Sequence, residues 1–227
     1  MSDQLTTTKR STGTALTNTI AAISATGGLL FGYDTGIISS ALLQLKAEFH
    51  LDTLGAEIVT SAIILGALFG CLGAGTLSDR MGRRRTVMVA AALFLIGTVM
   101  VATAHSVAML ITARLLLGLA IGAASQIVPI YIAEISPPEK RGRLVVGFQL
   151  AVVFGVTVSL VTGYLLRDHS WRIMFGIGML PALILFVGMV FLPNSPRWLA
   201  MRGRHDEARD VLRKVRPSDE VAEQELR

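Results

Sequence analysis

The sequence has little charge and almost no cysteine. Only 16% of its 227 residues are charged, whereas 52% are hydrophobic and the mean hydropathy is +0.59. Soluble domains usually carry about 25% charged residues, so this composition indicates a membrane protein. The single cysteine, Cys71, excludes an internal disulfide and cannot form a metal site by itself.

Residues that perform catalysis or bind metals are also scarce. The four histidines are scattered in the polar segments, and nothing in the sequence resembles a metal-binding cluster. No nucleophile stands beside a base in a recognisable spacing. The sequence therefore predicts no metal site, no cofactor and no enzymatic activity.

Long hydrophobic segments are the main feature of the sequence. Runs of about 18 or more apolar residues are long enough to cross roughly 30 Å of hydrocarbon. Six occur, at residues 18–42, 56–77, 86–104, 109–132, 144–166 and 171–192. Short polar segments separate them, so consecutive helices run antiparallel. We predict an all-α membrane protein with a polar segment at 1–17, a six-helix bundle at 18–192 and a polar tail at 193–227.

The distribution of Lys and Arg predicts the orientation. Most of the 21 basic residues lie before the first span, in the second and fourth loops, and in the tail. The other loops carry only Lys46, Arg167 and Arg172. Cytoplasmic segments are the ones enriched in Lys and Arg, so both termini are predicted to be cytoplasmic. The same bias explains the net charge of +5 without a nucleic-acid partner.

Two predicted spans carry small residues at every fourth position. The series are Gly28, Gly32, Gly36 and Ser40 in the first span, and Gly147, Ala151, Gly155, Ser159 and Gly163 in the fifth. Small residues let helix backbones approach closely in lipid, so both series predict helix–helix contact faces. Asp34 follows Gly32 by two residues, and Gln149 follows Gly147 by two. Both polar side chains are therefore about 200° from the packing faces.

Asp34, in the stretch "GGLLFGYDTGIISS", needs a partner or water. An ionised aspartate facing lipid would cost about 2.5 to 3.5 kcal/mol, which favours a cavity inside the bundle. Arg114 in the fourth span lies at the same predicted depth, about 21 Å from the cytoplasmic edge. We predict that these charges meet in a watery cleft. The proton affinity of a carboxylate depends on nearby charge and on water, so the pair is a candidate for proton coupling. A static structural contact is the alternative interpretation.

The second loop contains the spaced motif "GTLSDRMGRRR". Gly75 is expected to allow close helix approach, Gly82 a tight turn, and Asp79 a cap on backbone amides. Ordinary cytoplasmic positive charge would explain the arginines but not the spacing. The loop resembles the signature G-x-x-x-D-R-x-G-R-[RK] of the major facilitator superfamily. Four further segments resemble its sugar porter family: "FGYDTG", "RLLLG", "YIAEISPPEKRG" and "PNSPRWL".

The resemblance implies a fold and a set of site residues. The fold would be the N-terminal half of a major facilitator, six transmembrane helices in a 3+3 inverted repeat, followed by a short cytoplasmic helical tail. By resemblance, Asp34 and Arg114 would couple protons, and Phe31 and Gln149 would bind substrate. A cytoplasmic gate network would comprise Gly75, Asp79, Arg80, Gly82, Arg83, Arg84, Glu134, Arg141 and Arg197.

Two features depart from related families. Asn194 replaces the usual glutamate of the "PESPR" motif, which puts one cytoplasmic salt bridge in doubt. The G-P-x-x-G-G motif of proton-driven drug exporters is missing from the fifth span, which disfavours export.

The tail predicts an amphipathic helix in "HDEARDVLRKVR", with Ala208, Val211, Leu212 and Val215 on one face. It resembles the linker between sugar porter halves, so the resemblance implies that the second six spans are absent. The expected function is proton-coupled import of a sugar or polyol across the plasma membrane. The expected partners are that substrate, the proton, the lipid bilayer and a complementary C-terminal six-helix half. A non-transporting remnant or membrane interaction module, and a carrier of another small solute, remain alternatives.

Overall fold

The computed structural model describes residues 2–216 and 218–226, and side chains are described from residue 17 to 216 and from 218 to 225. The described helices are α1 (Ser2–Phe49), α2 (Thr53–Met81), α3 (Arg83–Ala102), α4 (Val107–Ile135), α5 (Pro138–Leu165), α6 (Trp171–Ile177), α7 (Met179–Phe191), α8 (Pro196–Met201), α9 (His205–Val215) and α10 (Asp219–Leu226). The all-α prediction is confirmed.

Among the described residues, five segments are long and apolar enough to cross a membrane: α2, α3, α4, α5 and the combined stretch Trp171–Phe191. This stretch is interrupted at Gly178, where α6 ends and α7 begins. The first predicted span lies within α1, whose hydropathy is lowered by Asp34 and its glycines. The helix of α1 is continuous from Ser2, so the predicted boundary at residue 17 is not a break in the helix.

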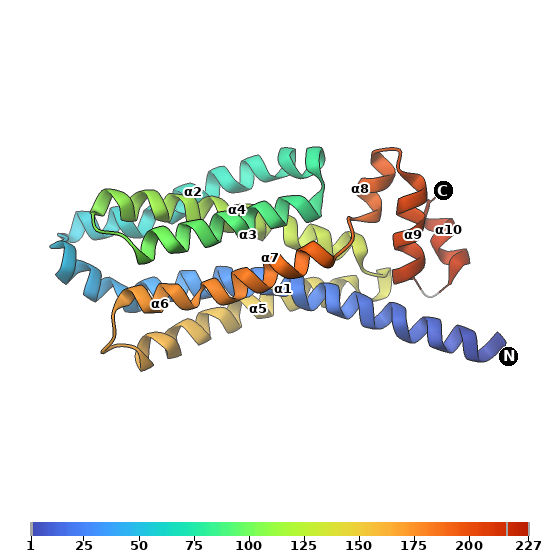
Figure 1. Cartoon of the computed structure of the whole chain (residues 1–227), viewed down its shortest axis with the longest axis horizontal. Helices are drawn as coiled ribbons and strands as arrows, with labels where there is room; N and C mark the ends of the chain where they lie inside the picture. The colour runs from blue at the N-terminus through green and yellow to red at the C-terminus, as the bar shows by residue number, and fades with distance from the viewer. Residues whose placement is uncertain (1, 217, 227) are drawn as a thin grey trace.

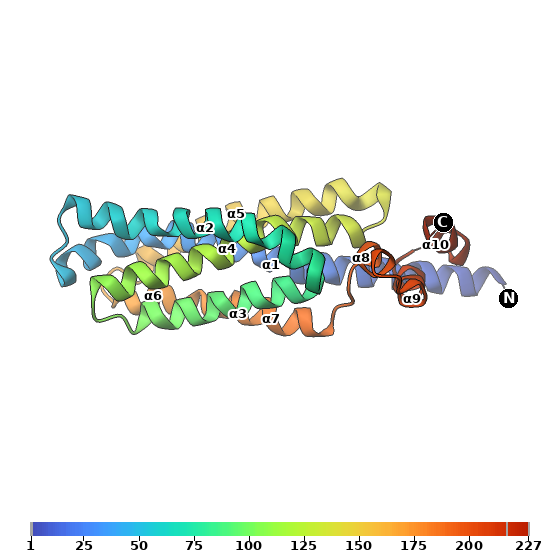
Figure 2. The same ribbon diagram turned by 90° about the horizontal axis from the view of Figure 1, so that it is seen from above.

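The long helices lie side by side along the long axis of the molecule (Figures 1 and 2). α1 packs on α5, α2 on α4, and α3 on both α4 and α7. Figure 1 shows the N-terminal part of α1 and the tail helices α8 to α10 at one end of the bundle, called here the termini end. The loops α1–α2, α3–α4 and α5–α6 lie at the opposite, far end.

Local sequence explains where several helices begin. The Asp52 carboxylate accepts a hydrogen bond from the Gly55 amide at 2.7 Å at the start of α2. The Ser106 hydroxyl accepts from the Met109 amide at 3.2 Å at the start of α4. Each side chain satisfies an amide that has no partner within its own helix, so the turns at the far end are fixed by short-range chemistry.

The α1–α5 interface depends on small residues. A Cβ atom at Gly32 would overlap the carbonyl oxygen of Val152, and one at Gly155 would overlap the carbonyl oxygen of Leu29. The α2–α4 interface uses the same device, because a Cβ at Gly66 would overlap the Leu115 carbonyl. Backbones in contact leave no room for side chains, which confirms the predicted small-residue contact on α1.

The predicted contact face on α5 is wrong in the N-terminal part of this helix. Nothing described lies within 4 Å of the position of a Cβ at Gly147, whereas Phe148 is buried and contacts Gly28. The α5 face that meets α1 consists of Phe148, Val152, Gly155, Ser159 and Gly163. Its mixed steps of three and four residues follow the 3.6-residue helical period, while the predicted series of constant fours drifts away from the contact.

A methyl group added at Gly32 is expected to destabilise the bundle. In Gly32→Ala the new Cβ forces α1 away from the Val152 carbonyl, which should lower the free energy of unfolding by about 1–3 kcal/mol. Reversible unfolding in mixed micelles measures this change. Gly73→Ala is the matched control, because the described structure leaves open space at that position. Equal stability of the two variants would contradict the close α1–α5 approach.

Candidate functional site

Asp34 and Arg114 form a direct ion pair between α1 and α4. The Arg114 Nη1 atom donates to Asp34 Oδ2 at 2.9 Å and to Oδ1 at 3.2 Å. Gly32 and Gly36 on the same helix face α5, so Asp34 points to the other side of α1, as the sequence predicts. The pairing predicted from helix depth is therefore present in the structure.

An aromatic ring of α6 also lies beside Arg114. Its guanidinium carbon lies 5.6 Å from the centre of the Phe175 ring, a cation–π arrangement. The Tyr33 hydroxyl donates to the Met174 carbonyl at 2.6 Å and holds α6 against α1. Arg114 Nε and Nη2 are buried and have no hydrogen-bond partner among the described residues. One carboxylate and one aromatic ring thus provide most of the favourable environment of this charge.

The predicted watery cleft around this pair is not what the structure shows. Asp34 is 2% exposed and Arg114 is 1% exposed, so both side chains are enclosed by protein. Mutual neutralisation makes such burial tolerable, whereas either charge alone would require water or another partner. The pair is buried in this conformation, and access from water requires helix movement.

Phe31 and Gln149 lie on neighbouring helices but in different environments. Phe31, one turn before Asp34, is partly buried and packs against the core. Gln149 is exposed on α5, next to Phe148, which contacts α1 at Gly28. The exposed Thr35 on α1 and Thr157 on α5 each donate to a carbonyl of their own helix. The exposed Gln149 amide can donate and accept hydrogen bonds at once.

At the termini end, Arg83 forms the centre of a second ionic cluster. Its Nε donates to Glu134 Oε2 at 3.0 Å and its Nη2 to Glu134 Oε1 at 3.2 Å. Its Nη1 donates to Asp79 Oδ1 at 2.9 Å. The Ser195 hydroxyl also donates to Glu134. This arrangement links α2, α3, α4 and the start of α8 through one guanidinium.

Several residues of the predicted network have other contacts. Arg84 donates to the carbonyls of Met189, at 2.8 Å, and Val190 at the end of α7 instead of pairing with a carboxylate. The Arg80, Arg141 and Arg197 side chains are exposed. None of these arginines forms an ion pair with a described carboxylate. Sequence spacing could not distinguish a carbonyl partner from a carboxylate.

The two glycines of the loop motif behave differently. Gly82 has φ of +92°, a conformation that side chains rarely adopt, and confirms the predicted tight turn. A Cβ there would also meet the Trp198 ring and the Asn194 side-chain oxygen at 3.2 Å. At Gly75 the prediction of close approach is wrong, because a Cβ would meet only Gln126 Nε2 at 3.9 Å.

Sequence reasoning missed the residues by which the tail holds the loop. Trp198 Nε1 donates to the Asp79 carbonyl at 3.0 Å. Arg202 Nη2 donates to the carbonyls of Asp79 and Arg80 at 2.9 and 2.7 Å. These donors satisfy the last carbonyls of α2, just as Arg84 satisfies those of α7. The Ser-Pro start of α8 was the available signal, since Ser195 caps this helix.

The far end has its own polar cluster, centred on Glu48. Its carboxylate accepts from Trp171 Nε1 at 2.6 Å and from Arg172 Nη2 at 2.7 Å. Arg172 also donates to the Ala104 carbonyl at 3.0 Å. Gln44 accepts from the Trp171 amide at 2.7 Å. The ends of α1 and α3 and the start of α6 are thereby joined.

Glu48 predicts a pH-dependent contribution to stability. Hydrogen bonds from Arg172, then Trp171, lower the pKa of this carboxyl below its usual 4.5. The stabilisation by ionised Glu48 is therefore complete above about pH 4.5. It is lost as the pH falls through the lowered pKa that Glu48 has in the folded state. At pH 7 we expect Glu48→Gln to melt about 1–3 °C below the wild type, with the difference vanishing in acid. Asp168→Asn, at an exposed carboxylate, is the control. A difference unchanged at low pH would contradict the assignment.

Fold and site define a multi-pass membrane protein in which Asp34 and Arg114 form an ion pair buried inside the bundle. The sequence profile described as "Sugar (and other) transporter" matches residues 20–226. The chain therefore belongs to the sugar porter family of the major facilitator superfamily.

Individual relatives agree with this membership. The putative metabolite transport protein YwtG of Bacillus subtilis is 40% identical over 198 residues, covering 87% of this chain and 43% of the relative. The arabinose-proton symporter of Escherichia coli K12 is 42% identical over 208 residues, covering 91% of this chain and 44% of the relative. The structure of the proton:xylose symporter XylE of E. coli, bound to 6-bromo-6-deoxy-D-glucose, matches with a TM-score of 0.83 and 31% identity. That match covers 94% of this chain and 52% of XylE. The chain thus spans about half the length of these relatives, which are transporters and not enzymes.

Proposed function

We propose that this chain is the N-terminal half of a proton-coupled importer of a sugar or polyol. The observation that carries the proposal is the buried Asp34–Arg114 ion pair, held between α1 and α4 inside a sugar porter bundle. A carboxylate in such a place can take up a proton only when the bundle opens to water. Protonation removes its charge and weakens the attraction to Arg114, which ties helix movement to proton uptake.

Substrate would bind to Phe31 on α1 and Gln149 on the neighbouring helix α5. An aromatic ring can pack on a sugar ring, and an amide can match a hydroxyl as donor and acceptor. Relatives named as arabinose-proton and proton myo-inositol symporters support this class of substrate. Folds of this kind bind substrate near the midplane, between two halves that rock against each other. The partner we propose is therefore a complementary six-helix half that completes the site.

The predicted orientation places the termini end in the cytoplasm of a plasma-membrane transporter. There the cluster of Arg83, Asp79 and Glu134, joined to the tail by Ser195, would fix the inner ends of four elements. The exposed Arg80, Arg141 and Arg197 remain available to carboxylates of the second half. Contacts of this kind would close the cytoplasmic side when the site faces outward.

Uptake by the completed protein tests the proposal. The chain would be co-expressed with the C-terminal half of the arabinose-proton symporter in cells lacking sugar transporters, and labelled pentoses, hexoses and inositol supplied. We expect concentrative uptake of at least one of them, abolished by a protonophore. Uptake that a protonophore leaves concentrative would exclude proton coupling. Correct insertion of both halves without uptake of any compound would favour the inert remnant.

A further inference from the structure

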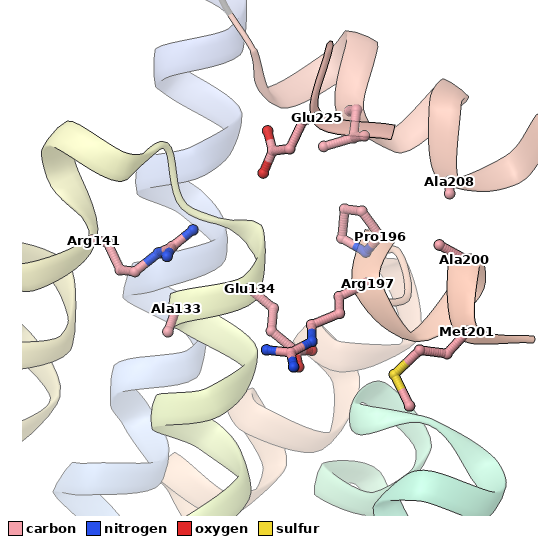
Figure 3. Close-up of a pocket in the computed structure, with 10 residues that line it drawn as sticks. Ala133, Glu134, Arg141, Pro196, Arg197, Ala200, Met201, Ala208 and Glu225 are labelled. Carbon is pink, nitrogen blue, oxygen red and sulfur yellow. The ribbon is translucent and has the colours of Figure 1, made fainter. Parts of the chain in front are cut away.

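A pocket opens at the termini end between the bundle and the tail. Its volume is about 390 Å³, and its walls come from the end of α4, the start of α5, and α8 to α10. Ala200 and Met201 contribute to an apolar wall. Glu134, Arg141, Arg197 and Glu225 are its charged residues. Figure 3 shows Arg141 extending from α5 on one side of the pocket and Arg197 extending from α8 toward Glu134 on the other.

Both carboxylates of this pocket are already neutralised. Glu134 receives two hydrogen bonds from Arg83 and one from Ser195. Glu225 receives a bidentate pair from Arg216, with Nη2 to Oε1 at 2.6 Å. The Arg216 side chain is fully buried, and its Nη1 donates to the Ile135 carbonyl at 2.8 Å. Neither carboxylate is therefore free to compensate another charge in the pocket.

Arg141 and Arg197 leave the pocket positively charged. Both are exposed, and neither has a carboxylate within 4 Å in the described part of the chain. A planar guanidinium presents paired N–H donors that match phosphate oxygens. The apolar wall beside them suits the carbon skeleton that carries such a phosphate. The volume also falls in the range of small-molecule sites.

We propose that this pocket binds an organic phosphate, with Arg141 and Arg197 holding the phosphate and the wall at Ala200 and Met201 contacting its carbon skeleton. This site lies at the end of the bundle, apart from the Asp34–Arg114 pair, and uses Arg141 and Arg197, for which carboxylates of the proposed second half would compete with the phosphate. The phosphate could belong to a soluble metabolite or to a phospholipid headgroup at the membrane surface. Both sources present a phosphate group to the arginines, and the experiment below distinguishes them.

Binding by the purified 227-residue chain tests the site. In nanodiscs of phosphatidylcholine alone, calorimetry with glucose 6-phosphate and with glucose measures the soluble source. In detergent, native mass spectrometry with added phosphatidylglycerol measures the lipid source. We expect binding of one phosphate compound and none of glucose, with affinity falling as salt rises. Arg141→Gln and Arg197→Gln should each weaken it about tenfold or more.

Two further variants separate the pocket from general positive charge. Arg143→Gln removes the same charge from an exposed position two residues along α5, outside the pocket, and should leave affinity unchanged. Ala200→Leu fills the apolar wall without changing charge and should reduce binding of the same compound. Binding of glucose 6-phosphate assigns the metabolite, and binding of phosphatidylglycerol alone assigns the lipid. Absence of binding in both arms, or equal losses in Arg143→Gln and Arg141→Gln, would overturn the proposal.

Discussion

Asp34→Asn in the completed transporter is expected to abolish accumulation of sugar against its gradient while preserving exchange of sugar across the membrane. Asparagine keeps the size of the side chain but carries no charge and cannot take up a proton. The buried site would then resemble the protonated state permanently, and the proton gradient would no longer bias the direction of transport. The internal concentration should rise only to the external one.

The measurement compares accumulation of labelled sugar with counterflow in the same vesicles. Asp168→Asn is the control, because Asp168 is exposed at the far end and pairs with the exposed Arg167. Loss of both accumulation and counterflow would indicate that Asp34 supports the fold, which is the static alternative. Full accumulation by Asp34→Asn would remove Asp34 from the coupling mechanism.

Arg114→Leu is expected to destabilise the isolated chain more than any surface change. The substitution leaves the Asp34 carboxylate buried with its only described ionic partner removed. Breaking a buried pair in this way costs about 3–5 kcal/mol. The free energy of unfolding in mixed micelles measures the loss. Arg167→Leu, at a side chain that is 64% exposed, should cost less than about 1 kcal/mol.

The double variant Asp34→Asn/Arg114→Leu separates the cost of an unpaired charge from the value of the pair. Removing both charges should recover most of the stability, since no ion then remains in the core. Recovery would mean that the pair adds little net stability and is consistent with a functional role. A double variant as unstable as Arg114→Leu would show that the pair itself holds α1 to α4.

The sequence alone predicts the features that depend on local composition. The length of the apolar runs defines the spans. Side chains such as Asp52 and Ser106 cap helix starts by accepting a hydrogen bond from the amide three residues later. Helical periodicity places Asp34 away from the glycine contact. A lone carboxylate within an apolar span needs a partner, so Asp34 is recognisable as a candidate site residue. The ion pair with Arg114 follows because α1 and α4 have few other charges at that depth.

Other contacts depend on how the helices cross and how the tail folds back. Nothing near residue 148 in the sequence reveals that Phe148, rather than Gly147, meets Gly28. The carbonyl partners of Arg84, Trp198 and Arg202 belong to helix ends distant in the sequence. A free carbonyl has no sequence signature, since every residue carries one.

Composition, hydropathy and spacing therefore predicted six spans, an orientation and a buried pair of charges, of which the structure confirms the pair. Tertiary structure decided that protein encloses that pair and which backbones touch. It also decided which arginines have no ionic partner among the described residues beside a pocket. The physical reason is that hydrophobicity and helical periodicity are properties of short stretches of sequence. Burial and the choice of ionic partner depend on the positions of whole helices.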